Sequence, residues 1–155
     1  KSRPSSNAML DSKEERDKSR PSSNAMLDSK EERDKLKEGV YHYSIEEHSL
    51  EMIKEGDRRA ELADACLEQD FIKDAPVSLV ITAKFYRTTQ RYGPRGQNYV
   101  YMEVGHACQN TYLAVTNLGL NTVEVGAFID EEVKKVLSLD KDSTPLIVMP
   151  IGCAK

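Results

Sequence analysis

The stretch QNYVYMEVGHACQNTYLAVTNLGL, residues 97–120, decides the fold class of this chain. It carries a single formal charge, Glu103, in a chain in which 31% of the residues are charged. No proline interrupts it, and as an α-helix it would be about 36 Å long. A surface helix normally has one apolar and one charged face, and this stretch has no charged face. We therefore predict a long central helix that is buried on most sides, inside the domain or between subunits.

The same stretch does not fit a membrane span. Several of its polar side chains would be costly in hydrocarbon, namely Gln97, Asn98, Glu103, His106, Gln109, Asn110 and Asn117. We expect a sheet to cover one side of this helix and a partner to cover another.

Charge and cysteine content exclude several classes of function. The chain has 155 residues, a net charge of −4 and a pI near 5.5. Nucleic acid and anionic membrane surfaces both require a basic footprint, so neither is expected as the main partner. Three cysteines, Cys66, Cys108 and Cys153, without CxxC spacing disfavour a disulfide framework and a zinc site. We expect reduced thiols in a cytoplasmic protein that holds no metal.

Residues 1–34 are an exact tandem repeat of KSRPSSNAMLDSKEERD, with copies at 1–17 and 18–34. Each copy has only Ala, Met and Leu to bury, which cannot offset the entropy of ordering. Ser-Asn-Ala before Met also resembles the remnant of a cleaved expression tag. We predict that residues 1–38 are a disordered tail or a tag-derived segment, and that the folded domain covers residues 39–155.

The first half of the domain is predicted to contain three strands and a helix. Two β-prone runs at 40–44 and 49–54 flank a polar turn and indicate a hairpin. Asp57 can cap a helix that ends before a connector at 70–76. The run VSLVITA at 77–83 is almost continuously apolar, which predicts a central strand buried on both faces.

The second half surrounds the long helix with a loop, two strands and a short helix. Residues 84–96, KFYRTTQRYGPRG, are basic and aromatic and are predicted to form a loop. A strand at 121–128, a helix at 131–137 and a buried strand at 145–152 follow the long helix. Long helices against a mixed sheet predict a layered α+β domain.

Common catalytic signatures such as the P-loop, GxGxxG and HExxH are absent from the sequence. His106 and Cys108 lie two positions apart and face different sides of a helix, so we interpret them as an interior histidine and a packing cysteine. The basic loop is the better candidate, because its arginines and aromatic rings can bind a phosphate or carboxylate and stack on a planar ring. A solvated basic loop is the alternative. Gly126, at a strand end, would let a ligand approach the backbone.

The order of these segments resembles the nitroreductase superfamily, and within it the SagB-type dehydrogenase branch. The resemblance covers residues 39–152 and rests on DAPVSLVITAKF, on RYGPRGQNYVYMEVGHACQNTYLAVTNLGLNTVEVGAF and on the closing PLIVMPIG. It implies an α+β fold with a mixed, mostly antiparallel sheet between helices and a long buried central helix. It also implies a homodimer with FMN at the subunit interface, reduced by NADH or NADPH and oxidised by a small organic acceptor.

The resemblance assigns candidate site residues at both ends of the long helix. Glu124, Val125, Gly126 and Ala127 match the segment beside the isoalloxazine ring, where backbone N–H groups would bind the flavin. Arg91 and Tyr92 match a catalytic pair that is Lys-Tyr in the azole-forming oxidases. Tyr92 would act as acid or base, whereas arginine is too basic to act as a base, which argues against azole synthesis. Lys155 is the candidate for the FMN phosphate.

The sequence departs from the family at its beginning. The arginine-rich motif that grips the FMN phosphate is missing, and Pro21-Ser22-Ser23-Asn24-Ala25 only imitates the Pro-Ser-x-x-Ala loop that follows it in the family. We interpret the domain as N-terminally truncated. Two functions remain open: an FMN-dependent NAD(P)H oxidoreductase, and a non-catalytic nitroreductase-like module that dimerises or binds a ligand without FMN. A different small-molecule binder is a third alternative.

Overall fold

A computed structural model describes residues 36–153. The chain divides into two units, Lys1–Leu36 and Lys37–Lys155, and the fold described here is that of the second. The predicted tail therefore lies almost entirely outside the described residues, as does Lys155. The elements of the second unit are β1 (Gly39–Ser44), β2 (Ser49–Glu55), α2 (Arg59–Ala65), α3 (Asp70–Asp74), β3 (Val77–Ala83), α4 (Tyr86–Tyr92), η1 (Gly93–Arg95), α5 (Gly96–Asn117), β4 (Asn121–Thr122), α6 (Asp130–Leu137) and β5 (Thr144–Gly152).

The main sheet is antiparallel, with strand order β3-β5-β4. Its longest ladder joins β3 to β5, from Val77 opposite Ile151 to Ala83 opposite Thr144. The central strand is β5, in which Val148 and Met149 are fully buried. The prediction that 77–83 is the central strand is wrong. An apolar run indicates burial without fixing strand order, and Val77 is 54% exposed at the edge that β3 forms.

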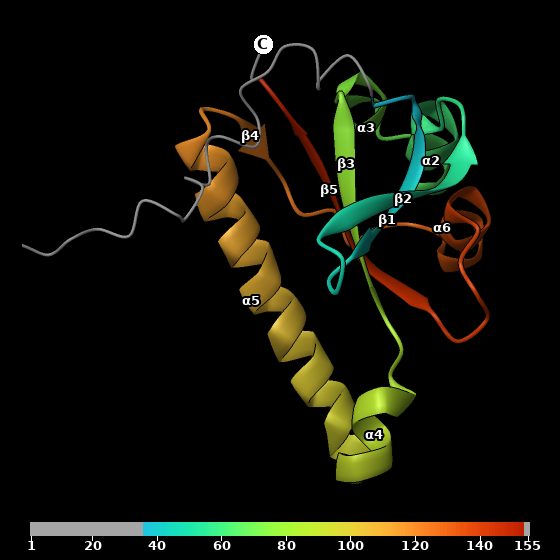
Figure 1. Ribbon diagram of the computed structural model, residues 1–155, viewed down its shortest axis with the longest axis vertical. Helices are drawn as coiled ribbons and strands as arrows, with labels where there is room; N and C mark the ends of the chain where they lie inside the picture. Colours follow the sequence, from blue (N-terminus) through green and yellow to red (C-terminus); the bar gives the residue numbers. More distant parts are fainter. Residues whose placement is uncertain (1–35, 154–155) are drawn as a thin grey trace, which may run out of the picture. The chain divides into compact units, whose positions relative to one another are not determined.

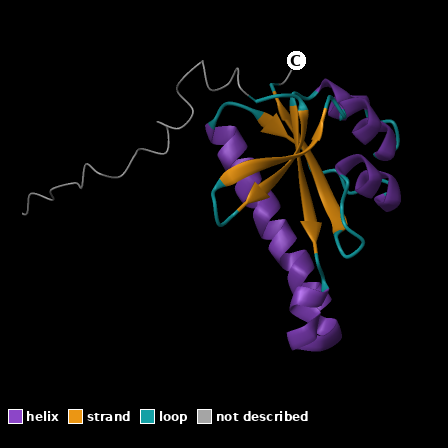
Figure 2. Cartoon of the chain, turned by 45° about the vertical axis from the view of Figure 1, so that its right-hand side comes forward, coloured by secondary structure: helices purple, strands orange, loops and turns teal. Residues whose placement is uncertain are grey.

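The main sheet lies between two helical layers (Figures 1 and 2). The long helix α5 covers one side, and α2, α3 and α6 gather on the other. The apolar cluster on this second side contains Leu62, Ala63, Ala65, Cys66, Ile72, Val125, Val133, Val136 and Val148. The predicted α+β class, with antiparallel sheets and a long helix, is confirmed.

The helix α5 begins and ends where backbone geometry requires glycine. A Cβ on Gly96 would lie 2.9 Å from the Cα of Thr89, so only glycine lets α5 start this close to α4. At the other end Gly119 adopts a φ of 71°. The N–H groups of Leu120 and Gly119 then bond to the carbonyls of Val115 and Thr116, which forms a Schellman motif and stops the helix.

Most of α5 is not covered by its own chain. Its buried residues are Gly96, Val100, Cys108 and Val115. Several large apolar side chains on it or at its C-cap are more than half exposed, namely Tyr101, Met102, Leu113 and Leu118. Burial inside the domain is therefore limited to one face, and the predicted interior position of His106 is wrong, because His106 is exposed. Cover for the remaining faces would have to come from outside the described residues.

The predicted hairpin is confirmed, and it forms a sheet of its own. β1 pairs with β2 antiparallel, with an irregularity between Val40 and Tyr41. At its turn, His48 has a φ of 48°. The Tyr43 hydroxyl hydrogen-bonds the Nδ1 atom of His48 at 2.6 Å, which ties β1 to the turn.

Three predicted segments have different local structure. Residues 70–76 contain the short helix α3 instead of a plain connector. Residues 84–96 form α4 and η1 instead of a loop. The strand predicted at 121–128 is reduced to Asn121–Thr122 and an isolated bridge between Val125 and Val148.

Candidate active site

The segment 121–129 leaves the end of α5, follows the edge of β5 and enters α6. Near its start, the backbone N–H of Glu124 donates to the Tyr112 hydroxyl at 2.9 Å. Val125 and Val148 exchange both backbone hydrogen bonds, at 2.9 and 3.0 Å. The backbone N–H of Ile129 donates to the Ala65 carbonyl at 2.8 Å. Main-chain and side-chain partners thus hold this segment from both of its ends.

The pairing of Val125 determines where the next donor points. Its carbonyl accepts from Val148 and lies in the same peptide group as the N–H of Gly126. None of the described peptide bonds is cis, so this N–H points opposite to that carbonyl, away from β5. Gly126 and Ala127 are both exposed, and their N–H groups donate to no other described residue. The result is a pair of open donors on an anchored backbone.

The surroundings of Gly126 leave its backbone unobstructed. A Cβ built on Gly126 would meet only the Cδ1 atom of Ile147, at 3.8 Å. The backbone can therefore be approached closely at this point, as the sequence predicts for Gly126. This absence of obstruction and the open N–H groups are features that a planar cofactor ring would require.

Glu124 also affects a buried thiol on α5. The side chain of Cys108 is 1% exposed, which confirms its predicted packing role. Burial raises the pKa of the Cys108 thiol, and the neighbouring Glu124 carboxylate raises it further. Cys108 is therefore held as a neutral thiol, and it is not an activated nucleophile.

Arg91 and Tyr92 lie at the end of α4 in a cluster of stacked side chains. The Arg91 guanidinium lies 5.3 Å from the centre of the Tyr92 ring. Tyr92 in turn meets Tyr99 edge to face, with ring centres 5.3 Å apart, and Arg95 lies 5.8 Å from the Tyr99 ring. The Tyr92 side chain remains 49% exposed. The arrangement presents an aromatic surface flanked by positive charge.

The two groups of predicted site residues are not brought together within one chain. The pair Arg91-Tyr92 precedes α5, and the segment 124–127 follows it. The 22 residues of α5 separate them by about 33 Å of helix. Figure 1 shows α4 and β4 at opposite ends of α5. A site that uses both groups must combine them from two molecules.

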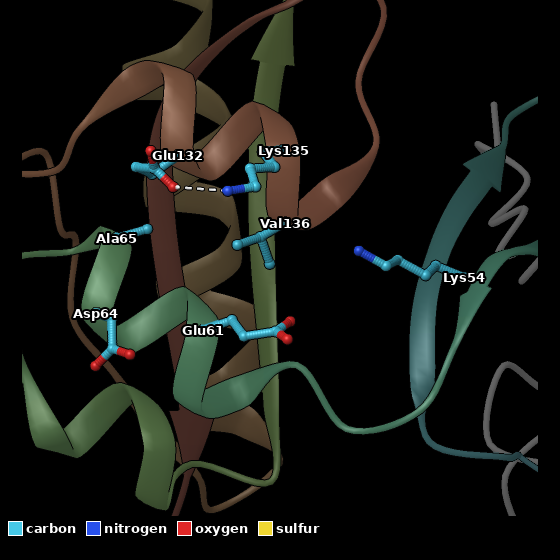
Figure 3. A pocket seen from close by; sticks show the side chains of 7 residues that line it. All are labelled: Lys54, Glu61, Asp64, Ala65, Glu132, Lys135 and Val136. Atoms are coloured by element: carbon cyan, nitrogen blue, oxygen red, sulfur yellow. Dashed lines mark ion pairs between the residues drawn. The ribbon is translucent and has the colours of Figure 1, made fainter.

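Two cavities lie away from the segment 124–127. One, of about 330 Å³, is formed by Lys54 on β2 together with side chains of α2 and α6, and Lys135 pairs with Glu132 beside it at 3.8 Å (Figure 3). The other, of about 290 Å³, lies between β3 and the first half of α5, beside Lys84 and Arg87. Of the predicted basic loop, Lys84 and Arg87 therefore both line this cavity, and Lys84 is also bonded to Asp140.

Sequence reasoning missed two residues of the candidate site. Tyr112 holds Glu124, and the Gln69 side chain donates to the Ala127 carbonyl at 3.2 Å. The latter pair is 58 positions apart, so no local pattern could indicate it. Within residues 36–153 no group of His, Cys, Asp or Glu side chains is arranged to hold a metal ion. None of the described helices is long and apolar enough to cross a membrane.

Comparisons with known proteins identify the family of the chain. A protein of Methanocaldococcus jannaschii, provisionally named a nitroreductase, is 50% identical over 116 residues, which cover 75% of this chain and 58% of that protein. This chain thus spans less than two thirds of that relative's length. A crystal structure of a provisionally named nitroreductase from Anabaena variabilis matches with a TM-score of 0.74 and 29% identity, over 78% of this chain and 25% of that one.

A third similarity is to the microcin synthetase complex of E. coli, solved with truncated pro-MccB17 bound. It has a TM-score of 0.66 and 26% identity, and covers 74% of this chain and 44% of that one. The model of the nitroreductase family itself matches residues 11–153. With an α+β fold, a long helix and antiparallel sheets shared with these neighbours, the chain belongs to the nitroreductase family.

Proposed function

We propose that this chain is part of an FMN-dependent oxidoreductase that passes electrons from NADH or NADPH to a small organic acceptor. The observation that carries the proposal is the pair of exposed, unpartnered N–H groups at Gly126 and Ala127 within the described residues. FMN supplies the redox chemistry, since its ring accepts and releases electrons that side chains cannot carry. The cytoplasm supplies both nicotinamide donors, and we propose it as the location.

The residues near Gly126 fit the ring of the flavin. Fixed backbone donors need no reorganisation when a ligand develops negative charge, so they favour the reduced ring. The N–H of Gly126 is fixed in direction by the Val125–Val148 bridge. Ala127 adds a second donor, and Glu124 brings a carboxylate beside them. For the phosphate, the candidate is Lys155, which lies outside the described residues.

A second copy of the chain would complete the site. Large apolar side chains on α5, such as Leu113 at 62% exposure, lack cover from their own chain. If two α5 helices pack antiparallel, Arg91 and Tyr92 of one chain approach the segment 124–127 of the other. The two groups lie at opposite ends of α5, so the two helices must pair along the length of its 22 residues. We therefore propose a homodimer whose sites are shared between subunits.

In that shared site Tyr92 would exchange a proton with the acceptor, and Arg91 would attract an anionic group. The Arg91 guanidinium over the Tyr92 ring keeps the two side chains together. Arginine keeps its proton throughout, so it contributes charge and hydrogen bonds. The similarity to the microcin synthetase complex and the sequence resemblance to the SagB-type branch leave the peptide-modifying chemistry as a subclass to test. We favour a small acceptor because Arg91 replaces the lysine of the azole-forming pair.

An FMN titration of the purified chain tests the proposal. Binding should appear as quenching of flavin fluorescence, and the complex should be reduced by NADH or NADPH. The variant Gly126→Ala should keep its stability within about 0.5 kcal/mol, because the added methyl meets only Ile147 at van der Waals distance. Its FMN affinity should fall, because the methyl displaces the ring from the backbone. A chain that takes up no FMN would support the alternative, a dimerising or ligand-binding module.

A further inference from the structure

The turn between α2 and α3 is strained and leads to a side chain that reaches the candidate site. Leu67 and Glu68 have φ values of 61° and 60°, a left-handed conformation that residues other than glycine seldom adopt. Leu67 is 57% exposed, so burial of its side chain does not account for the conformation. Strained backbone of this kind occurs where the surrounding structure requires a particular geometry. Here the turn leads directly into Gln69, whose side chain contacts Ala127.

The amide of Gln69 bridges two carbonyl groups. Its Nε2 atom donates to the Cys66 carbonyl at 2.6 Å and to the Ala127 carbonyl at 3.2 Å. Both partners are acceptors, so the NH₂ end of the amide faces them, with one N–H for each. Cys66 ends α2, where carbonyls lack helical partners. The side chain therefore hydrogen-bonds a carbonyl at the end of α2 and holds the segment 124–127 in place at the same time.

Gln69 occupies a position where another residue type would favour the helix more. It is the N-cap residue of α3, yet its side chain makes no capping hydrogen bond. Serine, threonine, aspartate and asparagine are the residues that cap helices well. The side chain at position 69 is thus used for the bridge to Ala127 instead of for α3.

The bridge completes the anchoring of the segment beside the open donors. The carbonyl of Ala127 belongs to the same peptide group as the N–H of Phe128, and the next N–H, of Ile129, is bound to Ala65. Val125 is held on the other side by Val148. Only the peptide group between Gly126 and Ala127 has no described partner, and anchored groups flank it.

We propose that Gln69 is a positioning residue that fixes the Ala127–Phe128 peptide and thereby the orientation of the donors at Gly126 and Ala127. Its own role is to hold the backbone, and the flavin is the ligand whose binding depends on that backbone. The inference rests on the proposed function only for the identity of the ligand. The anchoring itself can be tested without it.

The first experiment uses Gln69→Ser, which removes the bridge while supplying a better cap for α3. The urea midpoint should stay equal to that of the wild type or rise. Amide exchange of Ile129 in the ligand-free protein should accelerate about three- to tenfold, as expected for the loss of one or two hydrogen bonds. Amides of β3 should be unaffected, and the dissociation constant for FMN should increase by a similar factor. Leu67→Asn, which keeps Gln69 and tolerates the left-handed conformation, is the matched control and should change neither readout.

The second experiment uses Gln69→Glu, which places an acceptor opposite two carbonyl acceptors. At neutral pH this variant should bind FMN more weakly than Gln69→Ser. As the pH falls and the carboxyl group gains its proton, it can donate again, so affinity and Ile129 protection should recover. The wild type and Gln69→Ser have no such carboxyl group, so their FMN affinity and Ile129 protection should not increase in this way as the pH falls.

Each outcome either supports or overturns the positioning role of Gln69. Unchanged Ile129 exchange in Gln69→Ser, or no acid recovery in Gln69→Glu, would overturn the positioning role. Faster exchange in Gln69→Ser and acid recovery of protection in Gln69→Glu would support it even if the wild type took up no FMN. In that case the proposed cofactor, and not the anchoring, would be the part that failed.

Discussion

The Tyr112 hydroxyl accepts the backbone N–H of Glu124 at 2.9 Å and so joins the last turns of α5 to the edge of the main sheet. Tyr112 lies one helical turn after the buried Cys108, on the face of α5 that its own chain covers. The long helix and the segment 124–127 are therefore mechanically connected. A movement of α5 in a dimer would be transmitted directly to the open donors.

Replacement of Tyr112 by phenylalanine should weaken this connection. The ring is kept and one hydrogen bond is lost, so the free energy of unfolding should fall by about 0.5–1.5 kcal/mol. Urea denaturation measures the effect. Tyr101→Phe is the matched control, because the Tyr101 ring is 56% exposed and its hydroxyl bonds to no described residue. Equal losses in both variants would contradict the role of the Tyr112 hydroxyl.

Introduction of charge on the exposed face of α5 should separate the proposed dimer. Leu113→Glu places a carboxylate at a position that is 62% exposed in the single chain, so the fold of the chain should survive. Light scattering should then report a monomer with an unchanged circular dichroism spectrum. The corresponding change at Ile45, which is 83% exposed at the hairpin turn, should leave the mass at that of a dimer. A wild-type monomer would be inconsistent with the shared site.

Acid should weaken the fold partly through Asp140. The hydrogen bond from Lys84 lowers the pKa of Asp140 from 3.8 to about 2, with a further contribution from Ser143. Because the folded pKa is the lower one, this contribution is present above pH about 4 and is lost as the pH falls toward 2. Denaturation midpoints across this range should fall less steeply for Asp140→Asn. An unchanged slope in that variant would exclude Asp140 as a contributor.

The three thiols should differ in reactivity. Burial raises the pKa of Cys66 from 9.0 to about 11, so little thiolate is present at pH 8. Cys108 is also buried, whereas Cys153 is exposed. Iodoacetamide should therefore modify one site in the native protein and three in urea, as counted by intact mass. Cys153→Ser should abolish the native modification, and labelling that persists in this variant would show that a buried thiol becomes accessible.

The elements with strong periodicity were predictable from the sequence. The long helix, the hairpin and β3 lie close to their predicted bounds, because each is set by uninterrupted local preference, and glycine marks the ends of the helix and of the hairpin. Gly119 illustrates this, since the predicted stop of the helix is the observed Schellman motif. The helical nature of 84–96 was missed because that segment carries basic and aromatic side chains without an apolar period.

Strand order and the site anchors could not be derived in the same way. The central position belongs to β5, which contains Pro145 and Pro150, residues that usually indicate an edge. The candidate segment 124–127 was identified by resemblance, and its ligand contacts remain a prediction. Its anchors, Gln69 and Tyr112, depend on contacts between distant positions, which no pattern along the chain contains.

The donors at Gly126 and Ala127 belong to the main chain, and this has a consequence for how the protein can diverge. If FMN binds as proposed, substitution of the side chains that line its ring would leave such donors intact as long as the anchors at Val125 and Ile129 persist. Selection could then alter which acceptor is admitted without changing the backbone groups that contact the cofactor.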